Sequence, residues 1–139
     1  MKRRFHRDIG RLLGLGCLSA SFLGCAVTQN PGCSLTYVLA VGPNAATADH
    51  AAASPGNQAQ FRATVAPQAS SPGCPVPEFV AVVDATWTVS DAVDAEISSA
   101  AATNGLATCL IAALNPITVT AAYTANGVTQ VTTSSLVCK

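Results

Sequence analysis

The chain has 139 residues and no net formal charge, but its charges are unevenly distributed. Five of the seven basic residues lie within the first eleven positions, whereas residues 25–139 carry two basic and six acidic side chains, a net charge of −4. So few cations cannot neutralise a phosphate backbone, which argues against a nucleic-acid partner.

The first 24 residues have the three-part pattern of a secretory signal peptide, with a basic start, an apolar stretch and small residues. The apolar stretch, residues 12–24, is 13 residues long. A membrane-spanning helix needs about 20 residues, and no later segment is long enough either. We therefore expect residues 1–24 to direct export, the alternative being an amphipathic N-terminal helix of the mature protein.

The sequence Phe-Leu-Gly-Cys at residues 22–25 resembles a bacterial lipobox. Gly24 and Cys25 fit that pattern, while Phe22 stands where the family usually has leucine. The resemblance implies that Cys25 is acylated and becomes the first residue, anchoring the protein to a membrane through a tether of residues 25–32.

Cysteine parity agrees with processing at Cys25, since cutting at Cys17 would leave an odd thiol. Ordinary cleavage after Ala26 would leave the same four cysteines, so simple secretion stays open. Ala26 resembles the outer-membrane sorting class of Gram-negative lipoproteins. The expected location is the bacterial cell envelope, anchored in the outer membrane, with a periplasmic or secreted protein as the alternative.

Four cysteines follow the processing site: Cys33, Cys74, Cys109 and Cys138. In an exported chain they indicate two disulfides more readily than a metal site, because no pair has the C-x-x-C spacing of a zinc site and only one histidine, His50, follows the processing site. Three pairings are possible at this point.

Residues 33–139 are expected to form one β-domain, because apolar and polar residues alternate in three segments. Residues 58–66, 85–90 and 117–124 each present one apolar face and one polar face, as half-buried antiparallel strands do. Less regular candidates are residues 35–41, 96–98, 106–112 and 128–137. About seven strands predict an antiparallel β-sandwich.

Turn residues separate these segments. Asn126-Gly127 predicts a tight hairpin between the last two strands, because both central positions of a type I′ turn need positive φ. Residues 42–57 and 67–78 contain several prolines and glycines and are expected to be irregular and exposed. The expected core residues are Phe61, Trp87, Val119 and Tyr123.

No pattern of residues predicts catalysis or a cofactor. His50 lies near Asp49 and Ser54, but a loop without a rigid element does not hold a base beside a nucleophile. Trp87 alternates in phase with its apolar neighbours, which favours a core residue over a platform for stacking sugars.

One acidic cluster, Asp91, Asp94 and Glu96, is a weak calcium candidate. Calcium needs six to eight oxygen ligands, so backbone carbonyls would have to complete the site. The other interpretation is a polar turn between strands, and we expect no resident metal.

Residues 87–91, Trp-Thr-Val-Ser-Asp, together with the strands that follow them, resemble the bacterial Ig-like domains of the Big-2 type. Residues 56–65, Gly-Asn-Gln-Ala-Gln-Phe-Arg-Ala-Thr-Val, resemble the second strand of that family, where a glycine and the pattern Gln-x-Phe-x-Ala-x-Val recur. The resemblance covers about residues 35–137 and implies an Ig-like sandwich. The proline-rich segment 67–78 and the four cysteines depart from the common form.

The resemblance also implies a disulfide pairing. In Ig topology the start of the domain and the loop after the second strand share one pole, which places Cys33 near Cys74. The end of the later strands and the C-terminus share the other pole, which places Cys109 near Cys138.

The expected function is therefore that of a non-enzymatic envelope module for adhesion, spacing or assembly. The partner, a protein or a polysaccharide, is not indicated by the sequence. The alternative is a module that binds carbohydrate or calcium through loops at one pole. Fold alone does not decide between them.

Overall fold

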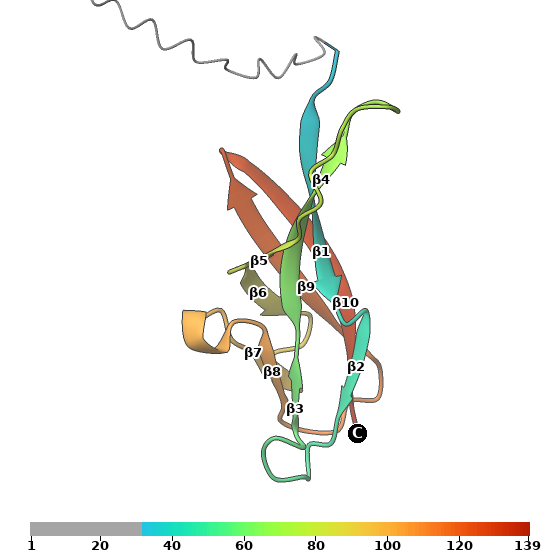
Figure 1. The fold of residues 1–139 in the computed structure, drawn as a ribbon. Coiled ribbons are helices and arrows are strands. Elements are labelled where there is room, and N and C mark those ends of the chain that lie inside the picture. Colours follow the sequence, from blue (N-terminus) through green and yellow to red (C-terminus); the bar gives the residue numbers. More distant parts are fainter. Residues whose placement is uncertain (1–31) are drawn as a thin grey trace, which may run out of the picture.

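The computed structural model describes residues 32–139, which are built almost entirely of β-strands (Figure 1). The elements are β1 Leu35–Gly42, β2 Ala45–Ala48, β3 Gln58–Gln60, β4 Arg62–Ala69, β5 Ala81–Val83, β6 Thr86–Val89, β7 Ala95–Ile97, the 3₁₀ helix η1 Ala101–Thr103, β8 Leu106–Cys109, β9 Ile117–Ala125 and β10 Val128–Cys138. The expected signal peptide and Cys25 lie outside the described residues. Nowhere in residues 32–139 does a helix reach the length and hydropathy needed to traverse a bilayer.

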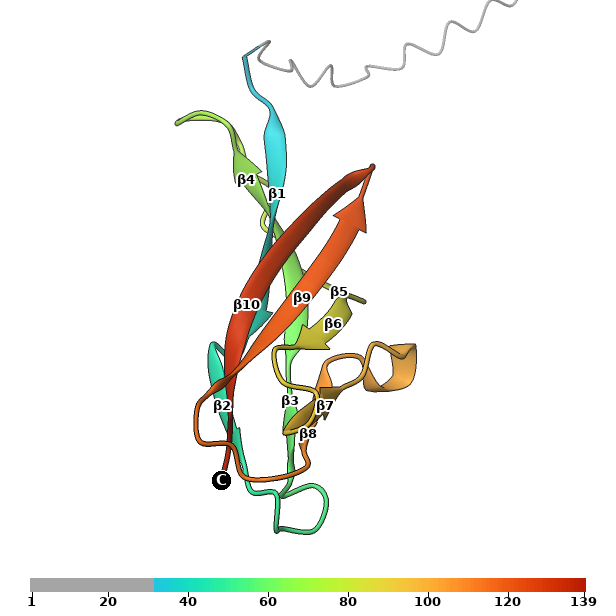
Figure 2. The same cartoon turned by 180° about the vertical axis from the view of Figure 1, so that it is seen from behind.

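The strands form two layers (Figures 1 and 2). One layer contains β1-β4-β5 and β3-β8-β7, which are continuous because β3 and β4 are interrupted only at Phe61. The other has the order β2-β10-β9-β6. Every pair is antiparallel except β2 with β10. The order β1, β3/β4, β8, β7 facing β6, β9, β10 is that of an immunoglobulin-like sandwich, so the expected fold class is confirmed.

The alternating segments place their apolar residues between the layers. Phe61 and Val119 are fully buried, and Trp87 is 4% exposed. The rings of Phe61 and Trp87 lie 6.4 Å apart between centroids, in a tilted arrangement favourable for aromatic pairs. Tyr123 is only half-buried, because β6 pairs with β9 no further than Ala122 and leaves this end of the layer narrower.

The core is poor in large side chains. Seven of its sixteen buried apolar residues are alanines. Alanine buries little apolar area, so the hydrophobic stabilisation comes mainly from a few larger residues such as Phe61, Trp87 and Leu136.

The structure has ten strands where about seven were expected. The strand expected over residues 58–66 is divided at Phe61, and both β2 and β5 lie outside the expected strands. The prediction that residues 42–57 are irregular throughout is wrong for β2, because pairing with the end of β10 overrides the weak strand propensity of alanine. The prediction that residues 67–78 are irregular is likewise wrong at its start, because β4 continues to Ala69. Proline is tolerated at position 67, since β5 does not extend alongside this part of β4 and no strand there needs an N–H group from this position.

The hairpin between β9 and β10 is confirmed. Asn126 and Gly127 both have positive φ, at 51° and 77°, as a type I′ turn requires. The pairing runs from Val128 opposite Ala125 to Leu136 opposite Ile117. This register turns Leu136 and Cys138 into the core.

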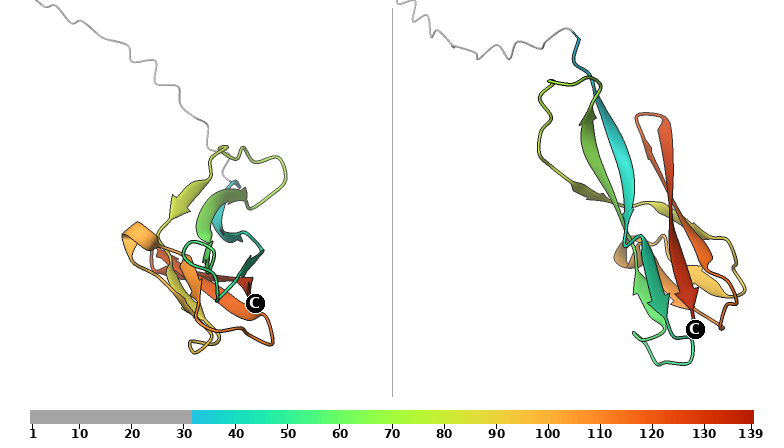
Figure 3. Two further views of the ribbon diagram at one scale, coloured as in Figure 1. Left: turned by 90° about the horizontal axis from the view of Figure 1, so that it is seen from below. Right: turned by 90° about the vertical axis from the view of Figure 1, so that its right-hand side faces the viewer.

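The two ends of the molecule are each closed by a disulfide. The N-terminal pole contains the start of β1, the segment 70–80 and the β9–β10 turn, and Cys33 is bonded there to Cys74. The C-terminal pole contains the β2–β3 and β8–β9 loops and the C-terminus, and Cys109 is bonded there to Cys138 (Figure 3). These are the pairs that the Ig-like resemblance implied.

A single amide side chain holds the start of β6 in place. Asn104 Oδ1 accepts a hydrogen bond of 2.6 Å from the indole N–H of Trp87 and one of 3.3 Å from the Ala85 N–H. Its Nδ2 donates to the carbonyls of Ala85 and Ser99. The indole N–H is thereby hydrogen-bonded within the sandwich, as buried polar groups generally are.

A second amide joins the two layers near the N-terminal pole. Gln130 on β10 accepts a hydrogen bond of 2.7 Å from the Leu39 N–H and donates one to the Tyr37 carbonyl. We expect Gln130→Ala to lower the free energy of unfolding by about 1–3 kcal/mol, because it leaves the amide of the buried Leu39 without a partner. Urea denaturation measures this change. Gln68→Ala, on an exposed position of β4, is the control, and equal stabilities of the two variants would contradict the prediction.

Candidate functional site

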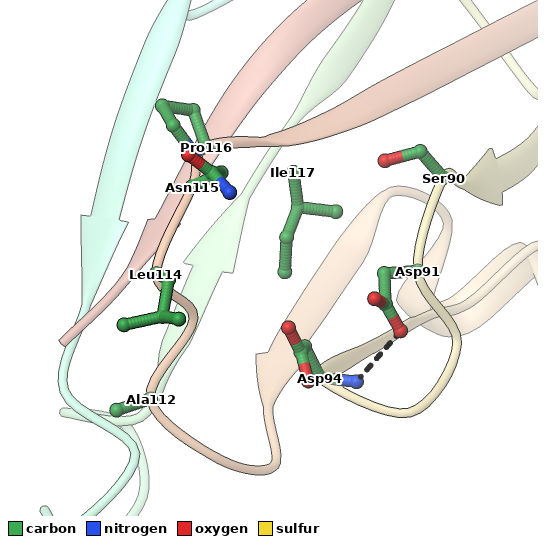
Figure 4. Close-up of a pocket in the computed structure, with 8 residues that line it drawn as sticks. All are labelled: Ser90, Asp91, Asp94, Ala112, Leu114, Asn115, Pro116 and Ile117. Carbon is green, nitrogen blue, oxygen red and sulfur yellow. Dashed lines mark hydrogen bonds between the residues drawn. The ribbon is translucent and has the colours of Figure 1, made fainter.

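One hollow on the described surface lies at the C-terminal pole, where two loops meet (Figure 4). Its volume is about 450 Å³. The β6–β7 loop contributes the polar side chains of Ser90, Asp91 and Asp94, and the buried Ile117 forms part of its wall. The β8–β9 loop contributes the remaining lining residues: Ala112, Leu114, Asn115 and Pro116.

Backbone hydrogen bonds fix the two loops to each other and to the sandwich. The Asp94 carbonyl accepts from the N–H groups of Leu110 at 2.8 Å and Ile111 at 3.3 Å. The Ala113 N–H donates to the Cys138 carbonyl at 3.0 Å, next to the disulfide. The hollow is therefore a preformed feature of the fold, and a partner does not have to order these loops on binding.

The same two loops expose four large apolar side chains, which we call the loop patch: Val93, Leu110, Ile111 and Leu114. Leu114 is 101% exposed and Val93 73%. Exposed large apolar groups on neighbouring loops, bordered by polar residues, are typical of surfaces that bind other molecules. Sequence reasoning missed the loop patch because residues 106–112 were expected to form one strand, whereas β8 ends at Cys109 and leaves Leu110 and Ile111 in the loop.

The three acidic residues of the calcium candidate do not converge. Asp91 and Asp94 line the hollow, whereas Glu96 lies on β7 and lines a different depression with Gln58. One Asp91 oxygen already accepts the N–H groups of Val93 at 2.9 Å and Asp94 at 3.2 Å, the second of which Figure 4 marks. Among residues 32–139, no group of three His, Cys, Asp or Glu side chains is placed to hold a metal ion.

A ligand raises the melting temperature only if it binds to a site in the folded protein, and the three carboxylates do not form such a site. We therefore expect millimolar calcium to leave the melting temperature unchanged. A thermal-shift series with calcium and with chelator measures this. An increase in the melting temperature that saturates with calcium would contradict it, and Asp94→Asn would then be tested for loss of that increase.

The other candidate residues also have structural partners. His50 Nδ1 lies 2.8 Å from the Lys139 carbonyl, and Ser54 donates to Gln58 at 3.1 Å. Asp49 accepts from the Ala51 N–H, as in an Asx turn. The structure thus places these side chains in three separate interactions and forms no relay from an acid through a base to a nucleophile.

The N-terminal pole exposes an aromatic pair. Tyr37 and Phe79 are 46% and 45% exposed, and their ring centroids lie 6.3 Å apart. Tyr37 also borders a hollow of about 230 Å³ between β1 and the β9–β10 hairpin, with Tyr123 and Gln130 on its other side. Sequence reasoning missed this pair because the two residues lie on β1 and in the segment 70–80, which only the fold brings together.

No protein-family model matches the chain, and comparison with curated proteins finds no match.

Proposed function

We propose that this chain is an exported, lipid-anchored protein of the bacterial cell envelope. Its single domain, of the bacterial Ig-like type, acts as a non-enzymatic module for adhesion or assembly. Acylated Cys25 would anchor it, and the loop patch would bind a protein partner. The strand order of the sandwich and the two disulfides support the Ig-like and export parts of this proposal.

The observation that carries the proposal is the position of the loop patch. The described chain begins at the N-terminal pole, and the β6–β7 and β8–β9 loops, which carry the loop patch, lie toward the opposite pole (Figure 3). An anchor at residue 25 would therefore leave the patch facing away from the membrane. The exposed leucine and isoleucine side chains offer apolar contact area, while Asp91 and Asp94 offer acceptors for basic or amide groups of the partner.

Cross-linking in intact cells tests the binding role. We expect the wild-type protein to form specific adducts and Leu114→Asp to lose most of them, because a charge at the centre of an apolar contact is costly to bury. Val82→Asp is the matched control, since Val82 is also exposed, at 66%, but lies on β5. Equal adduct yields for all three proteins would refute binding through the loop patch.

Metabolic labelling with radioactive palmitate tests the anchor. We expect the wild-type protein to incorporate label and to fractionate with membranes, and Cys25→Ala to do neither. If Cys25→Ala still incorporated label, Cys25 would not be the site of acylation. If the wild-type protein incorporated none, the protein would be secreted without an anchor.

A second candidate function, carbohydrate binding, is favoured by the exposed pair of Tyr37 and Phe79. Aromatic faces in an exposed position provide stacking surfaces, while their edges pack on the protein. Retention on immobilised envelope polysaccharide, lost in Phe79→Ala and kept in Leu114→Ala, would support this function over the first.

A further inference from the structure

We infer that the N-terminal pole is a lipid-contacting surface, which rests the domain directly on the bilayer. This inference rests on the proposed anchor at Cys25. The pole exposes six large apolar side chains, which we call the apolar pole: Leu35, Tyr37, Val38, Val76, Phe79 and Val80. Their exposed fractions run from 39% for Val76 to 68% for Val80. Within this group Tyr37 and Phe79 adjoin each other, with ring centroids 6.3 Å apart, and exposed apolar groups of this kind mark surfaces that contact a partner.

The charge distribution selects a lipid surface as that partner. Across residues 33–38, 66–80 and 124–130, which make up this pole, Glu78 is the only charged side chain. The charges Asp49, Asp91, Asp94 and Glu96 lie toward the other end of the sandwich, in or beside the loops of the C-terminal pole. With Glu78 as its single charged side chain, this surface enters the interface of a bilayer at a smaller cost of desolvating charges than the opposite pole, and tyrosine and phenylalanine suit that interface well.

The length of chain before the domain brings this surface to the membrane. Cys25 and Cys33 are eight residues apart, so the tether spans at most about 29 Å even when fully extended. Cys33 is bonded to Cys74 at the apolar pole, with a Cα–Cα distance of 5.6 Å. An acyl chain on Cys25 therefore holds the apolar pole, rather than the loop patch, within reach of the lipid.

The surroundings of the aromatic pair favour lipid over carbohydrate. Sugar recognition needs polar groups placed around the aromatic faces. The Gln130 side-chain amide beside Tyr37 is already hydrogen-bonded to the backbone of β1, which leaves Asn126 as the other amide that lines the same hollow. The other exposed large residues of this pole are valine and leucine, which offer no hydrogen bonds to a sugar.

Tryptophan fluorescence of the full mature protein in vesicles tests the inference. Phe79→Trp and Leu114→Trp each add one exposed indole, at opposite poles, while the native Trp87 is 4% exposed and gives both variants the same background. The acylated variants are incorporated into phosphatidylcholine vesicles, with or without brominated acyl chains. We expect the added indole of Phe79→Trp to emit at shorter wavelength and to be quenched severalfold by brominated lipid, and that of Leu114→Trp to be unaffected.

Each outcome decides between the proposals. If the protein is acylated but neither added indole is quenched, the apolar pole does not contact lipid, and the inference is wrong while the anchor at Cys25 still holds. Protein that carries no acyl group and does not float with vesicles overturns both. If soluble envelope polysaccharide abolishes quenching of Phe79→Trp while the protein stays in the vesicles, the apolar pole binds carbohydrate and the inference is wrong.

Discussion

Removing the bridge between Cys109 and Cys138 by the double substitution Cys109→Ala and Cys138→Ala is expected to lower the free energy of unfolding by about 3.5 kcal/mol or more. The cysteines are 29 residues apart, and a cross-link over a loop of this length restricts the unfolded chain by about that amount. Both cysteines are also nearly fully buried, at 2% and 1% exposure, so their packing is lost as well. The reduction is a large share of a typical stability of about 5–15 kcal/mol.

The bridge between Cys33 and Cys74 provides the comparison. Its cysteines are 41 residues apart. If the entropy of the unfolded chain were the only effect, this bridge would contribute slightly more to the free energy of unfolding, about 4 kcal/mol. However, both cysteines are only half-buried, and the segment 70–80 contributes no residue to the core. We therefore expect Cys33→Ala with Cys74→Ala to release that segment locally and to lower the midpoint of unfolding less. Denaturant titration of both double variants measures this, and a larger loss for the Cys33 pair would contradict the importance of burial.

Gly105→Ala is expected to destabilise the domain by about 4 kcal/mol or more, a loss large enough to prevent folding at 37 °C. Gly105 has a φ of +77° in the turn before β8. A Cβ at this position would lie 2.3 Å from the Phe61 carbonyl oxygen and 3.0 Å from Cζ2 of Trp87. Because these atoms belong to the backbone and to the core, they cannot move without disrupting the hydrogen bond from the Phe61 N–H to the Gly105 carbonyl.

Gly73→Ala separates backbone strain from steric conflict. Gly73 has a similar φ of +86°, but a Cβ there would meet nothing within 4 Å. Its substitution should cost only the left-handed strain, about 1–2 kcal/mol. Circular dichroism and thermal unfolding of both variants measure the difference. If Gly105→Ala were no less stable than Gly73→Ala, the close packing of Gly105 against Phe61 would not determine stability.

The strands that alternate clearly could be predicted from the sequence, because their apolar residues face a core on one side only. β2 and β5 could not, since both are short and exist only through pairing with β10 and β4. Nothing local marks Asn104 as the partner of the Trp87 indole, as that bond depends on how the turn before β8 meets β6.

The candidate sites were less predictable than the fold for the same reason. Asp91 and Asp94 were identified as a group because they are close in sequence, and the structure keeps them together. Glu96 was grouped with them wrongly, since the strand it occupies carries it to another face. The loop patch and the aromatic pair combine residues from distant segments, so their existence depends on tertiary structure.

The position of the Cys33–Cys74 bridge determines how the domain would carry mechanical load. A pull on residue 32 reaches the bridge before it reaches β1, so part of the force passes through a covalent bond into segment 70–80. The remainder acts along β1, whose eight residues are paired with β4 from Leu35 opposite Ala69 to Gly42 opposite Arg62. A force along β1 loads all the hydrogen bonds between β1 and β4 in parallel, so these bonds have to break together rather than one after another. With its first strand preceded by one disulfide and its last strand bonded at Cys138 in the other, the sandwich is suited to bear tension between the anchor and the partner that we propose.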